Sequence, residues 1–303
     1  MRSTTAALLI AALGAGTACR PQAGAAMSRT DSATVTERAE HLAQVLAQPD
    51  SSATKGAPIA KWILGADLLE ISGIALTRDG RLLGHADEGG RVFEIDFRTG
   101  RMGGHFDLGK DPVVADFEGI TSVGDTLYLL VSNGTLYEFQ AGPNGSRVEY
   151  TKHDTGLKDA CEFEGVAFDS TISSLLLACK NVRTKSPLQD SLVIYRWKLP
   201  GGSEPQPSRL TLPLAQITGP NGWKGLHPSD IAVDPTSGNY VLVAADESAL
   251  IEITPAGQLV FARPLGPGLD HAEGVAITKD SILIISTEGR PKLPSAVTLF
   301  RWP

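Results

Sequence analysis

The sequence predicts an all-β protein that folds as a five-bladed β-propeller, with six blades as the alternative. The first observation behind this prediction is a five-residue phrase that recurs five times. Aligned on their third residue, the copies fall at Ser72, Glu118, Glu164, Ser229 and Glu273, so the spacings are 46, 46, 65 and 44 residues. Repeats of about 40–50 residues made of short strands are typical of propellers, in which each repeat forms one four-stranded blade.

The second observation is the pattern that follows each copy of the phrase. After Glu118, the segments Ile120–Val123, Thr126–Val131 and Thr135–Phe139 are rich in Val, Leu, Tyr and Thr, and turn residues containing glycine separate them. Such β-rich runs bounded by Gly, Asp and Asn predict strands that are joined by tight turns. The first and fourth repeats show the same alternation.

The third observation concerns the two ends of the repeat array. The last repeat runs from Glu273 to Pro303 and has room for three strands, while the apolar segment Ile59–Leu64 stands alone before the first repeat. Pairing this segment with the last repeat would give every blade four strands. We therefore expect the N-terminal strand to pair with the last blade and close the ring.

The front of the chain predicts export. Arg2 and the short apolar stretch from Ala6 to Ala15 are typical of a signal peptide, here residues 1–18. The small residues before Cys19 resemble the lipobox of bacterial lipoproteins, in which this cysteine is lipidated and becomes the first residue. We therefore expect a bacterial cell-envelope protein that its lipid anchors to a membrane, with simple secretion as the alternative.

Residues 19–56 are rich in Ala, Ser, Thr and Gln, and we expect a flexible tether with a marginal helix over Val35–Gln48. Residues 57–303 would form the propeller. The net charge of -7 argues against a nucleic-acid partner, which favours a basic surface. We expect a monomer that binds an unknown protein or small molecule.

Two cysteines, Cys161 and Cys179, remain after Cys19. They flank the first predicted hairpin of the third repeat, and a turn centred near Ser170-Thr171 would place them opposite each other. An exported protein favours oxidation, which predicts a disulfide, while a pair of buried thiols is the alternative.

The repeated phrase also predicts a functional site. The innermost strand of a propeller blade lines the central channel, so the third residues of the five copies should meet at one mouth. We expect the ends of the second strands to add further acids there: Asp87, Glu88, Asp246, Glu247 and Glu288. The result would be an electronegative funnel. Three cations are expected near it, either offsetting the acids, contacting an anionic ligand, or remaining solvated loop charges: Lys180, Arg290 and Lys292.

Carboxylates that crowd around a narrow channel repel one another, so either some hold protons or a cation lies among them. Oxygen ligands without cysteine suit Ca²⁺, which makes Glu118, Glu164, Glu273, Ser72 and Ser229 the candidate ligands. His227 and His271, each two residues before its anchor, leave a transition metal open. The alternative is that these glutamates form hydrogen bonds between blades around a water-filled channel.

Several motifs in this order resemble the SdiA-regulated (YjiK-like) family: the repeated Glu-Gly-Ile/Val phrase, Leu69–Ile74, the Asp87-Glu88-Gly89 turn and His227–Val233. The resemblance covers about Pro58 to Trp302. It implies an exported or membrane-anchored bacterial protein, a five-bladed propeller distantly related to NHL repeats, and a calcium site at the channel. It implies no established activity.

Two function classes follow from the predicted site. The first is a non-enzymatic, lipid-anchored binding module with Ca²⁺ at the channel mouth. The alternative is a metal-dependent hydrolase resembling esterase-, lactonase- or phosphodiesterase-type propellers, in which a channel metal activates water and Glu164 acts as the general base.

Overall fold

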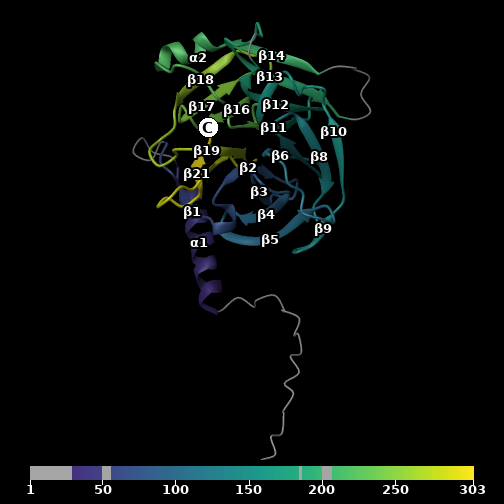
Figure 1. Ribbon diagram of the computed structural model, residues 1–303. Coiled ribbons are helices and arrows are strands. Elements are labelled where there is room, and N and C mark those ends of the chain that lie inside the picture. Colours follow the sequence, from purple (N-terminus) through teal and green to yellow (C-terminus); the bar gives the residue numbers. More distant parts are fainter. Residues whose placement is uncertain (1–28, 50–55, 184–185, 200–206) are drawn as a thin grey trace, which may run out of the picture.

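The computed structural model describes residues 29–49, 56–183, 186–199 and 207–303. Its strands form five sheets, four of them with four strands and one with five. The sheets stand around one axis, with the innermost strands near the centre and the outer strands along the rim (Figure 1). This confirms the predicted five-bladed β-propeller.

Each blade runs outward from the channel in antiparallel pairs. The innermost strands are β2 (Ile71–Leu76), β6 (Phe117–Val123), β11 (Cys161–Asp169), β15 (Asp230–Val233) and β19 (Ala272–Ile277). The second strands are β3 (Leu82–Ala86), β7 (Thr126–Val131), β12 (Ser174–Val182), β16 (Tyr240–Ala244) and β20 (Ile282–Thr287). The third strands are β4 (Arg91–Asp96), β8 (Thr135–Gln140), β13 (Ser191–Lys198), β17 (Ala249–Ile253) and β21 (Ala296–Arg301).

The outer strands are β5 (Arg101–Leu108), β10 (Tyr150–Asp154), β14 (Ser208–Pro213), β18 (Leu259–Pro264) and β1 (Ala60–Ile63). A short strand, β9 (Arg147–Val148), pairs in parallel with β5. β1 pairs with β21, so that Ala60 lies opposite Leu299 and Ile63 opposite Ala296. The N-terminal strand therefore completes the fifth blade, which confirms the predicted ring closure.

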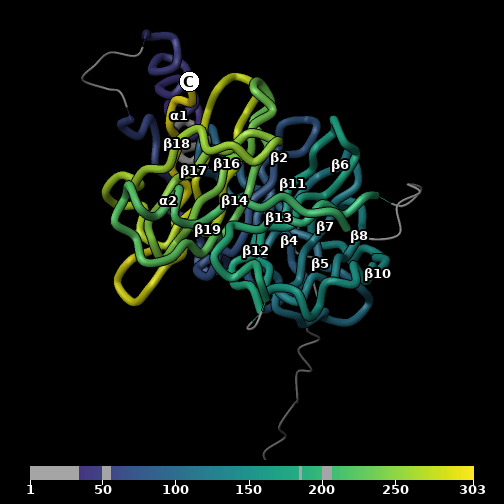
Figure 2. The backbone as a smooth tube through the Cα atoms, turned by 90° about the horizontal axis from the view of Figure 1, so that it is seen from above, coloured from purple at the N-terminus to yellow at the C-terminus, as the bar shows by residue number. Residues whose placement is uncertain are grey.

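Helix α1 (Arg29–Ala47) is longer than the helix expected from the sequence, and it packs against the ring. Leu42 is 2% exposed and joins the apolar cluster between blades 5 and 1. The Arg301 guanidinium donates hydrogen bonds to the carbonyls of Val45 and Gln48. α1 lies next to β1 in Figure 1 and near the C-terminus in Figure 2. Part of the segment expected to be a tether is thus docked.

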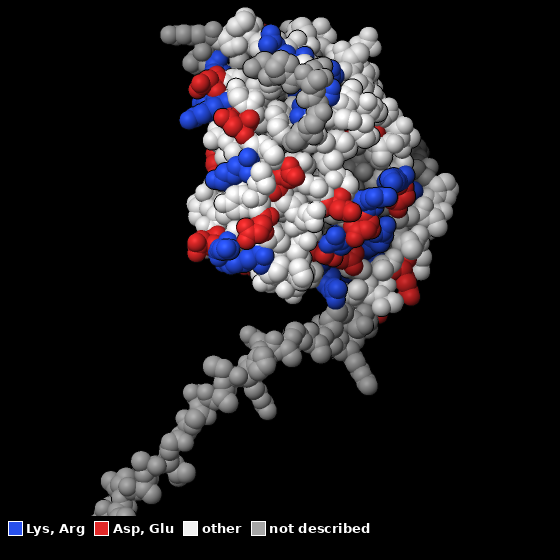
Figure 3. All heavy atoms as spheres, turned by 90° about the vertical axis from the view of Figure 1, so that its right-hand side faces the viewer, with Lys and Arg blue, Asp and Glu red and all other residues white. Residues whose placement is uncertain are grey.

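The signal-peptide residues and Cys19 lie outside the described residues. Among the residues that are described, no helix is both long and apolar enough to cross a membrane. On the face that Figure 3 shows, basic and acidic side chains lie side by side rather than in separate patches.

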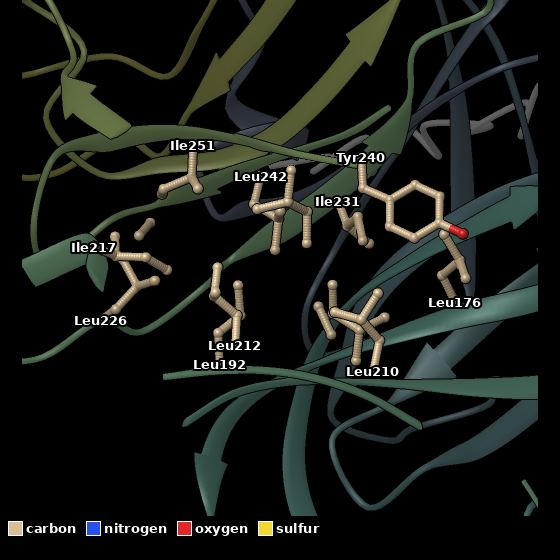
Figure 4. Close-up of a cluster of buried hydrophobic side chains, with 14 of the residues drawn as sticks. Leu176, Leu192, Leu210, Leu212, Ile217, Leu226, Ile231, Tyr240, Leu242 and Ile251 are labelled. Atoms are coloured by element: carbon tan, nitrogen blue, oxygen red, sulfur yellow. The ribbon is translucent and has the colours of Figure 1, made fainter. Parts of the chain in front are cut away.

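Apolar side chains fill the seams between neighbouring blades. In the seam between blades 3 and 4, Leu210 and Leu212 face Ile231 and Leu242 (Figure 4). Helix α2 (Leu214–Asn221), which the sequence pattern did not predict, covers one end of this cluster. α2 and the loop after it help to explain why 65 residues separate the third anchor, Glu164, from the fourth, Ser229.

Cys161 and Cys179 form a disulfide in this structure, with their Cα atoms 5.6 Å apart. They do not lie directly opposite each other as the sequence predicted, because Cys161 pairs with Val182 and Cys179 with Phe163. The difference arises from the turn after Asp169, which extends to Ser174 and includes Ser173 in the left-handed region at φ 51°. The disulfide is therefore diagonal across the hairpin.

Candidate functional site

The five anchor residues lie where the innermost strands begin, at one end of the channel. In four blades the anchor is the extra residue of a β-bulge, since the ladder skips it while its two neighbours are paired. The skipped residues are Ser72, Glu118, Glu164 and Glu273. Ser229 directly precedes β15. Bulges re-aim side chains and are frequent next to active sites, so each anchor leaves the strand's regular alternation.

Glycine after the anchor has a packing role at this bulge. A Cβ on Gly119 would lie 2.8 Å from the Glu164 carbonyl oxygen, and one on Gly165 would lie 2.7 Å from the Asp230 backbone. The missing side chains therefore let neighbouring blades approach closely. In blade 4 the equivalent residue is Asp230, whose carboxylate accepts a 2.8 Å hydrogen bond from the Val275 backbone N–H of blade 5.

Lys180, at the end of β12, is the cation of this mouth. Its Nζ donates a 2.9 Å hydrogen bond to Glu164 Oε1, and the Glu164 side chain is 7% exposed. The positive charge of Lys180 also acts on Glu118 and Glu273, whose pKa values it lowers. Three glutamates from three blades thus share the field of one lysine.

The glutamates are protonated more readily than in water. Burial, followed by the charge of Glu164, raises the pKa of Glu118, and burial also raises that of Glu164 against the opposing effect of Lys180. Burial, together with the charges of Glu164 and Glu288, raises the pKa of Glu273 to about 7, while Lys180 and a hydrogen bond with Ser229 oppose this rise. Burial and mutual repulsion therefore favour the neutral forms of these glutamates, and Lys180 opposes this effect only in part.

The two anchor serines have protein partners. Ser72 Oγ lies 3.3 Å from the Glu118 carbonyl oxygen and 3.4 Å from Glu118 Oε2. Ser229 Oγ accepts a 2.9 Å hydrogen bond from the Ala245 backbone N–H. Both hydroxyls therefore serve to connect segments at the mouth.

A second ring surrounds the anchors and was not predicted as a ring. In each of blades 2 to 5, the residue two positions before the anchor lies beside a polar side chain that follows or ends the second strand. The pairs are Asp116 with Ser132, Glu162 with Asn181, His227 with Glu247, and His271 with Glu288. The sequence signal was available, because the same two slots carry polar residues in every one of these repeats.

The acids predicted at the mouth have different surroundings. Glu247 accepts hydrogen bonds from the backbone N–H of His227 and contacts its Nδ1 at 2.9 Å. Asp246 is 63% exposed on its side chain. Glu88 is exposed, and Asp87 has one buried carboxylate oxygen, Oδ1, without a hydrogen-bond partner among the described residues.

One group of side chains has the spacing of a metal site. Ligand atoms of His271, Glu273 and Glu288 all lie within 4.8 Å of one another, and this is the one such group among the described residues. It contains two of the predicted acids, Glu273 and Glu288, and a histidine. Of the five predicted ligands it contains Glu273, while Glu164 is paired with Lys180 and both serines have protein partners.

Comparison with known proteins supports the fold. No protein-family model matches the chain, and no curated protein matches it either. The resemblance to the SdiA-regulated family therefore stays a prediction. Among solved structures, the glutaminyl cyclase of Myxococcus xanthus is similar at 14% identity and a TM-score of 0.51, over 80% of this chain and 94% of that one.

The PQQ-bound aldose sugar dehydrogenase of Streptomyces coelicolor has the same identity, 14%, and the same TM-score, 0.51, over 80% of this chain and 98% of the other. At this level of identity the likeness shows the β-propeller fold alone.

Proposed function

We propose that the protein is an exported, lipid-anchored binding module that holds a divalent cation at the blade 5 side of its channel mouth. The observation that carries this proposal is the group formed by His271, Glu273 and Glu288, whose ligand atoms lie within 4.8 Å of one another. Glu273 lies in β19, His271 directly precedes that strand, and Glu288 directly follows β20, so all three ligands belong to the first hairpin of blade 5.

The electrostatics of the mouth support a cation. Burial raises the pKa of Glu273, the nearby carboxylates of Glu164 and Glu288 raise it further, and Lys180 opposes this only in part. A bound divalent cation would stabilise the ionised form of Glu273 and remove this repulsion.

The donor set bears on which cation binds. The sequence predicted Ca²⁺, which takes six to eight oxygen ligands. One imidazole nitrogen with two carboxylates suits a transition metal such as Zn²⁺ or Mn²⁺ better. The side chains of His271 and Glu288 are 35% and 33% exposed, so a cation held there would be accessible to a ligand from solution.

Thermal unfolding of chelator-treated protein with added Zn²⁺, Mn²⁺ or Ca²⁺ tests the proposal. At 100 times the Kd, binding to the folded state alone should raise the Tm by about 5–10 °C. His271→Ala should abolish this rise. The matched control is His227→Ala, which removes the equivalent histidine of blade 4. No Tm change with any of the three metals, or an equal loss in both variants, would contradict the site.

The lipid anchor has a separate test, because Cys19 is outside the described residues. Cys19→Ala should move the protein from the membrane fraction to the soluble fraction, and an unchanged distribution would contradict anchoring at this cysteine.

No contact among the described residues favours the alternative hydrolase, because Glu164, the expected base, is already paired with Lys180.

A further inference from the structure

The opposite end of the channel contains a hollow that the predicted site does not use. The inner strands enclose a channel of about 160 Å³, and a cavity of about 630 Å³ adjoins it at the turns that follow the innermost strands. Leu76, Ser122, Phe168 and Ile277 line both spaces. A volume of this size is in the range of small-molecule sites.

The floor of this cavity is apolar. Leu76, Phe97, Phe168 and Ile277 line it, and Phe97 is 2% exposed. Phe97 is held in place because its carbonyl accepts a 2.7 Å hydrogen bond from Trp62 Nε1 and its side chain packs in the same cluster as Leu42 of α1. Both the backbone and the side chain of Phe97 therefore have partners beneath the cavity.

Two cations at the rim occupy equivalent positions of two repeats. Blade 1 reads Thr-Arg-Asp-Gly at residues 77–80, and blade 5 reads Thr-Lys-Asp-Ser at residues 278–281, so Arg78 and Lys279 follow the same threonine. The first-hairpin turns of the other three blades contain neither lysine nor arginine. Since blades 5 and 1 are neighbours, both cations line the same cavity.

The turns that carry these cations are closed by the same hydrogen bonds. Thr77 Oγ1 accepts a 3.0 Å bond from the Arg81 N–H, and Thr278 Oγ1 accepts a 3.0 Å bond from the Ile282 N–H. The next turn of blade 1 adds Arg98, whose guanidinium lies 4.6 Å from the centre of the Phe97 ring. Hydrogen bonds within the turns therefore hold the backbone at Arg78 and Lys279 in the same conformation in both blades.

Charge at this rim is unbalanced. The lining residues include three cations, Arg78, Arg98 and Lys279, and one carboxylate, Asp280. None of the three cations forms an ion pair with another described residue. Asp79, which neighbours Arg78, is paired instead with Arg81 at 2.8 Å. An apolar floor under unpaired cations fits a molecule with an anionic head and an apolar body.

We propose that this cavity binds an organic carboxylate with an acyl or aryl body. The carboxylate lies between Arg78, Lys279 and Arg98, and the body covers Leu76, Phe168 and Ile277. Charge-assisted hydrogen bonds to the head provide selectivity over neutral amphiphiles. The inference does not rest on the proposed cation site, which lies at the other end of the channel.

Calorimetric titration of the full chain with octanoate tests the inference, with octan-1-ol as the neutral counterpart. We expect saturable octanoate binding and about tenfold weaker binding of the alcohol. The double variant Arg78→Gln/Lys279→Gln should raise the octanoate Kd about tenfold or more and leave the alcohol's Kd unchanged. Both residues are on exposed turns, so the fold should persist, and unchanged unfolding of the variant checks this.

The matched control, Lys158→Gln/Lys224→Gln, removes the same charge outside the cavity and should bind octanoate like the unmodified chain. Absence of saturable binding in the millimolar range would overturn the inference, as would equal affinity in both double variants. The titration is repeated with a chelator present. Octanoate binding should not change, so failure of the cation site and failure of this cavity are distinguishable.

Discussion

Blades 4 and 5 bring the same two residue types to the channel mouth but arrange them differently. In blade 4, His227 Nδ1 lies 2.9 Å from Glu247, whose side chain is 10% exposed. In blade 5, His271 Nδ1 lies 4.0 Å from Glu288, and both side chains are about one-third exposed. His271 also lies in the left-handed region at φ 56°.

The anchor residue accounts for the difference. Blade 4 has Ser229 there, whose hydroxyl accepts a hydrogen bond from the Ala245 backbone N–H, while His227 Nδ1 lies 2.9 Å from Glu247 and 3.7 Å from Asp246. Blade 5 has Glu273, which adds a second carboxylate beside Glu288. The same sequence slots therefore hold a tight contact between His227 and Glu247 in one blade and a looser three-ligand group in the next.

The first prediction extends the comparison to blade 3, whose first hairpin has the disulfide that the first hairpins of blades 4 and 5 lack. Replacing both Cys161 and Cys179 with serine should lower the free energy of unfolding by about 3 kcal/mol, because a crosslink over a short loop constrains the unfolded chain. Denaturant unfolding measures this. Mass measurement after alkylation, with and without reductant, should show two protected thiols; two freely alkylated thiols in exported protein would contradict the bond.

The second prediction separates the two blades directly. Glu273→Gln should remove the metal-dependent rise in Tm, about 5–10 °C at 100 times the Kd, because it removes one of three ligands. Glu247→Gln, the matched change in blade 4, should keep that rise. Equal behaviour of the two variants in thermal unfolding with metal would show that the blades do not differ in function.

The third prediction concerns the lysine that the neighbouring blades share. Lys180→Met should lower the free energy of unfolding by about 2 kcal/mol, since removal of one partner leaves Glu164 without its counter-charge. The effect is smaller than for a fully buried pair because the Lys180 side chain is 30% exposed. The double variant Lys180→Met/Glu164→Gln should recover most of the loss. A double variant no more stable than the single one would mean that the lysine stabilises the mouth in another way.

The fourth prediction uses pH. Glu273 has a pKa of about 7 in the folded protein against 4.5 in its unperturbed state, so the folded state binds more protons between these values. Stability without metal should therefore fall as the pH rises from about 4.5 to 7, lowering the Tm by a few degrees. Glu273→Gln should make this dependence shallower, and the raised pKa values of Glu118 and Glu164 account for the part that remains. A Tm that rises through this range with the same slope in both proteins would contradict the assigned pKa.

Much of the architecture could be predicted from repetition alone. The spacing of the five anchors indicated five blades, and the unpaired segment Ile59–Leu64 indicated how the ring closes, because blade number and strand order follow from local periodicity. The clustering of the anchors at one mouth also followed, since equivalent residues of equivalent repeats occupy equivalent places.

The details of the site were harder to predict. The β-bulge at four of the anchors has a sequence signal, a glycine inside a strand, but the ladder itself was needed to show that the anchor is skipped. The partner of Glu164 is Lys180, which lies across the first hairpin of blade 3. The register of this hairpin differs from the predicted one, because its turn is longer than expected and Cys161 pairs with Val182 instead of Cys179. Docking of α1 depends on Arg301 at the far end of the chain.

By itself, the sequence determined the number of blades, the closing strand and the ring of anchors, because each depends on a pattern that repeats along the chain. Tertiary structure alone decided which carboxylates have a partner, which group of three remains open, and which end of the channel gathers Arg78 with Lys279. Those outcomes depend on distances of a few ångströms between separate blades, and a linear pattern does not specify such distances.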